Sequence, residues 1–177
     1  MIYDSRTIEE QAVLHTAQRI CAAARTAPKG KGLDNLETLV LTGADKDAVA
    51  EQMEALAGPL NYKFFLRDAQ NVRAAQALVL LGMRESKRGL NDGCGYCHFE
   101  NCAECAEKNG VCAFDAVDIG IAIGSAVAAA ADDRVDSRVY FSVGRAALQM
   151  KIMGPAVSMI FGILVSVSGK SPFFDRK

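Results

Sequence analysis

The stretch Ala77-Leu-Val-Leu-Leu81 is a continuous apolar run with no polar residue inside it. A short run of this kind is typical of a strand that is buried on both faces of a sheet. Because both faces of such a strand must be covered, we expect a sheet centred on 77–81 with other elements packed above and below it.

Helical and strand-like segments alternate on both sides of this run. The chain has 177 residues and half of them are apolar, which fits one α/β domain, 1–177, with helices on both faces of a central sheet. The polar, Gly-rich and Cys-rich segment 83–113 has no helical or strand period and is expected to be an inserted loop. Helices are expected at 4–27, 45–57, 69–76, 115–131 and 145–153, strands at 36–42, 62–66, 77–81, 138–143 and 159–168, and a polar tail at 169–177.

Several residues have expected local roles in these elements. Thr7 and Glu10 have the spacing of a capping box, and Asp115 is placed to cap the helix that follows the loop. Cys21 falls on the apolar face of the first helix, where a structural role is expected. Small residues around Gly124 and Ser125 indicate that another backbone or a ligand comes close to the helix 115–131.

The bulk composition excludes several classes of function. The formal net charge is −1 and Trp is absent, so neither a nucleic-acid-binding surface nor a basic membrane-binding surface is expected. The N-terminus is polar, and the apolar stretch 119–131 is about half as long as a membrane span. We therefore expect a cytoplasmic protein.

The cysteines point to a metal-binding or redox site. The chain has six cysteines, and five of them lie in one short segment, whereas disulfide frameworks spread their cysteines along the chain. Gly93 and Gly95 would let the backbone pass close to a cluster of iron and sulfide. The candidate metal ligands are Cys94, Cys97, Cys102, Cys105 and Cys112.

Zinc is the main alternative metal. The pairs Cys94-x2-Cys97 and Cys102-x2-Cys105 would provide four thiolates for a tetrahedral site, with His98 as a substitute ligand. Zinc sites usually separate two such pairs by about 15–20 residues, so the four residues here leave little room. Free or oxidisable thiols are a further alternative.

The spacing Cys94-x2-Cys97-x4-Cys102 with a later cysteine resembles the motif of Rnf-type electron-transport B subunits and corrinoid iron–sulfur proteins. This resemblance implies a four-iron four-sulfur (4Fe–4S) cluster with Cys112 as the fourth ligand, and leaves Cys105 as a spare or alternative ligand. His98 stands where those families usually have Gly.

The chain as a whole resembles an uncharacterised prokaryotic family of ferredoxin-domain-containing proteins. The segments 23–32, 118–126 and 168–176 carry this resemblance, which implies an iron–sulfur cluster.

A fainter similarity is to nitroreductases, whose early helix also ends in an Ala-Pro turn like that at Ala27-Pro28. This similarity implies a nitroreductase-like three-layer fold, FMN as a second cofactor and a homodimer. The residues that it places near the flavin are Lys29, Gly30, Lys31, Gly124 and Ser125.

Three functions follow as hypotheses. The first is an iron–sulfur redox protein that passes single electrons to a redox partner protein. The second is a nitroreductase-like, flavin-dependent oxidoreductase. The third is an interaction module stabilised by zinc. No catalytic residue is assigned, because His15 and His98 are the only histidines and no nucleophile–base pair stands out.

Overall fold

A four-stranded antiparallel sheet lies at the centre of the computed structural model, which describes residues 1–174. The strand order is β1-β2-β4-β3, so β2 is an interior strand. All residues of β2 from Ala77 to Met83 are buried, which confirms the expected strand at the middle of the sheet. The strands are β1 (Leu36–Leu41), β2 (Ala77–Arg84), β3 (Asp136–Tyr140) and β4 (Val157–Ser166).

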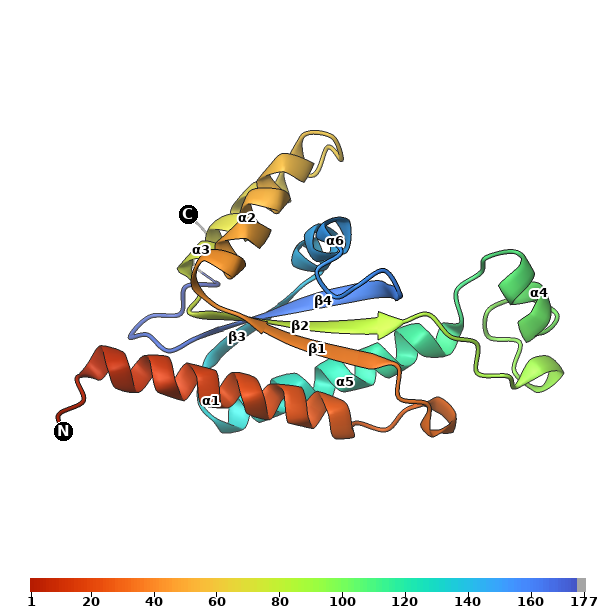
Figure 1. The fold of residues 1–177 in the computed structure, drawn as a ribbon, viewed down its shortest axis with the longest axis horizontal. Coiled ribbons are helices and arrows are strands. Elements are labelled where there is room, and N and C mark those ends of the chain that lie inside the picture. Colours follow the sequence, from red (N-terminus) through yellow and green to blue (C-terminus); the bar gives the residue numbers. More distant parts are fainter. Residues whose placement is uncertain (175–177) are drawn as a thin grey trace.

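Two long helices cover one face of the sheet (Figure 1). They are α1 (Ser5–Thr26) and α5 (Ala113–Asp132), and they pack against each other. Val79 and Leu81 point from β2 into the core on this side, where they meet Ile20 of α1 and Ile119 of α5.

Three shorter helices cover the other face: α2 (Gly43–Ala57), α3 (Phe64–Ala74) and α6 (Phe141–Met150). Leu78 and Leu80 point from β2 into this second core. Gly144 lets α6 lie directly on β4, because a Cβ there would come within 1.7 Å of the Ile160 carbonyl oxygen. The result is the expected three-layer α/β arrangement, with helices on both faces of the sheet.

The predicted strand at 62–66 is wrong, because Phe64 begins α3. Phe65, Ala69 and Val72 are buried at helical spacing, and the rings of Tyr62, Phe64 and Phe65 pack on one another with centroids 5.0–5.6 Å apart. A short apolar run fits a strand and a helix equally well, and here the helical contacts decide.

Both predicted caps are also wrong. Asp4 caps α1 by accepting a hydrogen bond from the Thr7 N–H at 2.8 Å, while Glu10 pairs with Arg6. The N-cap of α5 is Cys112, and Asp115 is a buried residue inside the helix.

Two C-terminal boundaries differ from those expected. β3 ends at Tyr140, and α6 begins four residues before the expected position 145. The expected tail at 169–177 is irregular as far as Phe174, and its last residues, 175–177, lie outside the described part of the chain.

α5 is longer and more exposed than the sequence indicated. Within residues 1–174 it is the one helix that is long and apolar enough to span a membrane by length and composition, which corrects the expectation of a stretch half that long. This is weak evidence for a span, because core helices pass the same test. Only 33% of its most apolar window is buried, so much of its apolar surface faces outward.

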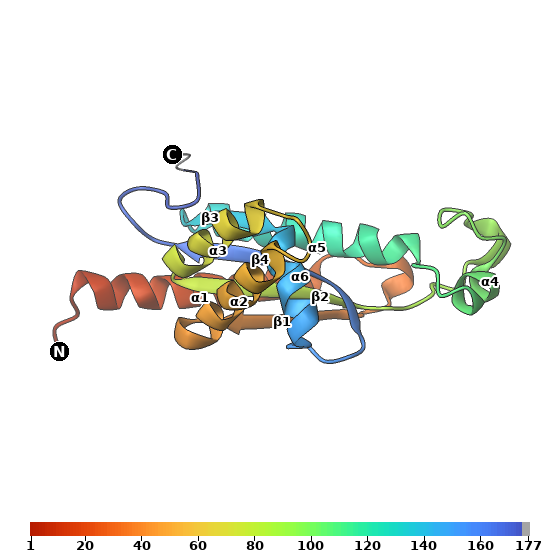
Figure 2. The same ribbon diagram turned by 90° about the horizontal axis from the view of Figure 1, so that it is seen from above.

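The cysteine loop projects from one end of the molecule, far from both termini (Figures 1 and 2). It leaves the end of β2 and returns to the start of α5. The insertion was expected at 83–113, and in the structure it runs from 85, directly after Arg84, to 112. Contrary to expectation it has some helical structure, the short turn η2 (Asn91–Gly93) and the helix α4 (Cys102–Glu107).

Candidate metal centre in the cysteine loop

α4 is fixed at both ends by its own side chains. Asn101 caps it by accepting hydrogen bonds from the N–H groups of Ala103 and Glu104, each at 3.0 Å. Glu104 in turn accepts from the Glu100 N–H at 2.7 Å and pairs with Lys108 one turn later. These bonds hold Cys102 and Cys105 on one short helix.

Cys105 is the best-shielded thiol of the loop, with 1% of its surface exposed. The ring of Phe99 and the backbone of Gly110 close over it. A Cβ on Gly110 would lie 2.3 Å from the Phe99 ring and 3.1 Å from the Cys105 sulfur. Only Gly fits at this position. The expected close passage at Gly93 and Gly95 stays a prediction, because a Cβ at either would meet nothing within 4 Å.

Two other loop thiols, Cys97 and Cys112, are near enough to Cys105 to act electrostatically on its thiol. Burial raises the pKa of Cys105, and the two neighbouring thiols raise it further. Cys94 and Cys102 are half-buried in the same loop, while Cys21 lies half-buried on α1, outside the loop.

A buried ion-pair network anchors the base of the loop. Arg88, just after β2, donates from Nη1 to Asp115 at 2.9 Å and from Nη2 to Asp118 at 2.6 Å. Asp115 also accepts from the Ser86 N–H, and Asp118 from the Gly30 N–H. The three charged side chains are at most 2% exposed. Arg88 therefore joins the start of the loop, the start of α5 and the turn after α1.

The charges within this network act on one another. Burial raises the pKa of the Asp115 carboxyl, although the Ser86 N–H and Arg88 oppose this. Burial works against the Arg88 charge, yet the two carboxylates raise the pKa of its guanidinium. Arg88 Nε is buried without a hydrogen-bond partner among residues 1–174.

Two aromatic rings form a second link between the loop and the body. Tyr96, between Cys94 and Cys97, stacks on Phe114 of α5 with centroids 6.0 Å apart. Phe114 also packs against Gly30, where a Cβ would lie 2.9 Å from its ring. The cysteine loop and the Gly30 turn therefore share one contact residue.

The residues expected to bind a flavin lie on two segments, the turn after α1 and the helix α5. The Lys29 ammonium donates to the carbonyls of Arg25 and Ala27 at 2.6 and 2.8 Å, so it caps the C-terminus of α1. Lys31 is exposed, in a left-handed conformation (φ 58°), and Gly30 is held by Asp118 and Phe114. Gly124 and Ser125 lie farther along α5.

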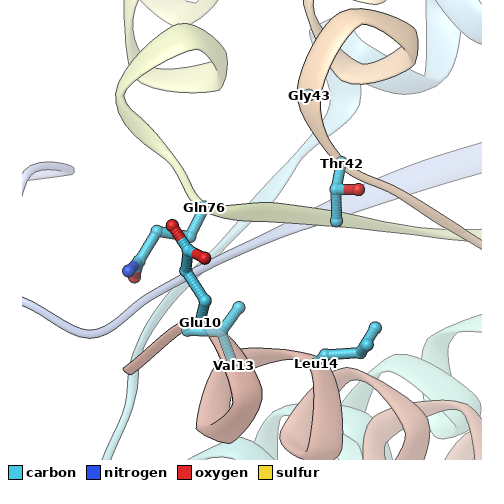
Figure 3. A pocket seen from close by; sticks show the side chains of 6 residues that line it. All are labelled: Glu10, Val13, Leu14, Thr42, Gly43 and Gln76. Atoms are coloured by element: carbon cyan, nitrogen blue, oxygen red, sulfur yellow. The ribbon is translucent and has the colours of Figure 1, made fainter. Parts of the chain in front are cut away.

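A pocket of about 350 Å³ lies elsewhere, between the first half of α1, the start of α2 and the start of β2 (Figure 3). A second pocket lies between the end of α5, the start of β3 and the segment after β4, and a third lies beside β1 near Ile152 and Met153. None of these three pockets is lined by a cysteine or by the Lys29–Lys31 turn. The residues that line the first pocket are Glu10, Val13, Leu14, Thr42, Gly43 and Gln76.

Comparison with known proteins places the chain in a family. A family model described as "Uncharacterized protein containing a ferredoxin domain (DUF2148)" matches residues 108–176. A protein of Archaeoglobus fulgidus, named only "Uncharacterized protein", is 36% identical over 184 residues, which cover 99% of this chain and 98% of the relative. The chain belongs to this ferredoxin-domain family. The family model includes Cys112 but begins after the other four loop cysteines.

Solved structures confirm the nitroreductase-like fold of this ferredoxin-domain protein. A nitroreductase with bound FMN from Desulfitobacterium hafniense superposes with a TM-score of 0.60 at 15% identity, over 88% of this chain and 78% of that one. Nitroreductase A from Vibrio parahaemolyticus gives 0.56 at 14% identity. The chain covers 89% of its own length in that match but only 60% of the nitroreductase. At such low identity the likeness establishes the fold alone.

The loop of the ferredoxin-domain protein suits an iron–sulfur cluster in its donor chemistry. All five side chains are thiols, and glycines allow the backbone to approach. In residues 1–174 no three side chains of His, Cys, Asp or Glu are placed to hold a single metal ion. Cys97 and Cys112 lie near Cys105, but the thiols do not converge on one point, and Cys21 lies outside the loop on α1.

Sequence reasoning missed Arg88 and Asp118 and gave Asp115 the wrong role. The signal was present in α5, because Asp115, Asp118 and Ala122 have the spacing of one helix face, and Ala122 belongs to the core. Two carboxylates on a buried face require a cation. Arg88 lies in the segment that was expected to be a loop without helices or strands.

Proposed function

We propose that this protein passes single electrons through a 4Fe–4S cluster held by its cysteine loop. The observation that carries the proposal is the set of five thiols on one short segment, two of them buried, at one end of a ferredoxin-domain protein. Iron–sulfur clusters are held by thiolates, and hydrogen bonds and solvent exposure around the sulfurs set their reduction potential. When bound, the cluster supplies the one-electron chemistry.

The structure supports a different ligand set from that implied by the motif. Cys105, a spare or alternative ligand by the resemblance, is the most buried thiol of the loop, and Cys97 and Cys112 both act on it electrostatically. We take these three as ligands, with Cys94 or Cys102 as the fourth. Both candidates are half-buried on the same loop, so the choice between them falls to mutagenesis.

Zinc is the less favoured metal. A single zinc ion holds four thiolates at about 2.3 Å, so the four sulfurs must surround one point closely. The described residues have no such arrangement. A cluster binds its ligands at the corners of a larger body and so suits the more dispersed thiols of this loop.

The test is metal and sulfide analysis of protein that is purified without oxygen. We expect brown protein with iron and acid-labile sulfide near four atoms of each per chain, and a paramagnetic signal after one-electron reduction. Stoichiometric zinc without sulfide would refute the proposal.

Single substitutions then test the ligand set. Cys97→Ser, Cys105→Ser and Cys112→Ser should each abolish cluster binding, and Cys21→Ser is the matched control that should leave it intact. A fully loaded Cys105→Ser protein would return the assignment to the motif, with Cys94, Cys97, Cys102 and Cys112 as ligands.

A flavin-dependent oxidoreductase is the second candidate, favoured by the fold that the chain shares with FMN-bound nitroreductases. In this version FMN would lie near Lys31 and pass electrons to or from the cluster. Release of flavin on denaturation of protein saturated with FMN tests it, with Lys31→Ala as the variant expected to weaken binding. Failure to retain FMN would leave the cluster as the only redox centre.

We also propose a homodimer that works with a separate redox protein in the cytoplasm, where a reducing environment keeps thiols available. The exposed stripe on α5 supports the dimer. Val117 and Ile121 are 46% and 40% exposed, and Gly120 and Gly124 beside them have open space around the Cα atom. Small residues in such a stripe let two helices approach closely.

A further inference from the structure

We infer that Arg88 is the positioning residue of the metal centre: its ion pairs to Asp115 and Asp118 hold the two halves of the cysteine loop in register. This inference rests on the proposed function, in which the positioned thiols bind the cluster. The inference concerns the thiols themselves, so it can be tested in cluster-free protein.

The ligand candidates enter the loop from opposite ends. Cys94, Cys97, Cys102 and Cys105 follow Arg88 along the chain, while Cys112 directly precedes α5 and lies three residues before Asp115. Cys112 therefore approaches Cys105 only if the chain after β2 and the first turn of α5 keep a fixed relation. The bond from Arg88 to Asp115, at 2.9 Å, is the charged link between these two segments, beside the Ser86 N–H bond to the same carboxylate and the stacking of Tyr96 on Phe114.

The geometry of the link is specific. One guanidinium reaches two carboxylates that are three residues apart on α5, and its Nη1 also donates to Ser86 Oγ at 2.7 Å. Ser86 Oγ accepts a further bond from Asn35 on the connection before β1. A planar guanidinium with several donors can hold all of these positions, whereas a lysine ammonium offers a single point.

Stability alone is a poor explanation for this network. Two buried carboxylates face one buried guanidinium, and the Arg88 Nε donor is left without a partner in the described chain. Apolar or neutral groups in place of such a buried ionic set are often neutral or stabilising, because the desolvation penalty is removed. The network costs desolvation free energy, and it lies where the cysteine loop joins the body. We explain it by the fixed relative position that it gives to the two ends of the loop.

The deciding variant removes the charges without leaving one unpaired. Arg88→Met alone strands two buried carboxylates without a counter-charge and destabilises the folded chain. The triple variant Arg88→Met/Asp115→Asn/Asp118→Asn is neutral throughout, and each Asn oxygen can still accept the N–H of Ser86 or Gly30. We expect it to fold with a melting temperature close to that of the wild type.

The readout is the rate at which each thiol is alkylated in cluster-free protein, resolved by mass spectrometry. We expect Cys105 and Cys112 to react about tenfold faster in the triple variant, because the loop opens more often, while Cys21 keeps its rate as an internal control. Ser142→Ala is the control variant, because it removes a buried 2.7 Å hydrogen bond to Asp68 beneath the opposite face of the sheet. It should leave the rates of Cys105 and Cys112 unchanged.

The second readout is iron and sulfide uptake by the same folded variants. The triple variant should load less cluster than the wild type, and the cluster it does load should be lost faster to a chelator. Wild-type alkylation rates together with wild-type uptake in the folded triple variant would overturn the inference. If no variant takes up iron and sulfide, the proposed function fails, and the alkylation rates still decide whether Arg88 positions the thiols.

Discussion

The body of the molecule and its cysteine loop are held together by different means. The sheet has an apolar core on each face, built from side chains of every strand and long helix. Of residues 85–112, by contrast, only Arg88, Cys105 and Cys112 are buried. A segment whose interior is one cation and two thiols has no hydrophobic core of its own. Its order must come from its anchor to the body and from whatever the thiols bind.

The largest expected effect is a loss of folding stability in the body of the molecule. Leu80→Ala removes a fully buried side chain from β2, and we expect a loss of about 3 kcal/mol in the free energy of unfolding. The matched control is Leu90→Ala in the cysteine loop, where the side chain is 40% exposed and a change below about 0.5 kcal/mol is expected. Denaturant titration of both variants measures the contrast, and equal losses would show that the loop has a core after all.

A smaller effect should stay within the loop. Gly110→Ala places a methyl group against the Phe99 ring and the Cys105 sulfur. We expect this to destabilise the folded conformation of the loop by roughly 1–3 kcal/mol. Cluster content should fall while the melting temperature of the body is kept. Gly58→Ala, outside the loop at the end of α2 with open space around it, is the control that should load normally. Normal loading of Gly110→Ala would mean that Phe99 can move aside.

Cluster loading should reduce the difference between the two regions. We expect amides of α4 and its flanks to exchange hydrogen about tenfold more slowly in the loaded protein, because the bound group becomes the missing core. Amides of β2 and β4 should exchange at the same rate in both forms. Hydrogen exchange followed by mass spectrometry checks this, and uniform protection of body and loop would contradict it.

The smallest expected effect concerns the outer face of α5. Gly124→Ala adds a methyl group in open space within a helix, so it should stabilise a single chain by about 0.5–1 kcal/mol. If two copies of α5 pack closely through this stripe, the same methyl group should weaken the dimer. Light scattering and thermal unfolding of the variant therefore separate the two cases. A monomeric wild type would end the dimer proposal.

The sequence predicted the body better than the loop, for a physical reason. The apolar run of β2 and the periodic faces of α1 and α5 report burial directly, so the three layers could be foreseen. The aromatic start of α3 was misjudged, because short apolar runs fit both helix and strand. The burial of Cys105 involves Phe99 and Gly110, and the Arg88–Asp115 ion pair joins residues far apart in the chain, so neither leaves a period in the sequence.

The positions of the loop ends have a consequence for how such a chain can vary. β2 and α5 belong to the body, and Arg88 ties their junction together, so the connection starts and finishes at points that packing already fixes. For a connection between fixed points, doubling the length costs only about 0.6 kcal/mol of chain entropy. The segment can therefore be lengthened, shortened or exchanged with little effect on the sheet. In this architecture the cysteine loop is a replaceable insert, and a chain with a plain turn in its place would keep the same fold without the thiols.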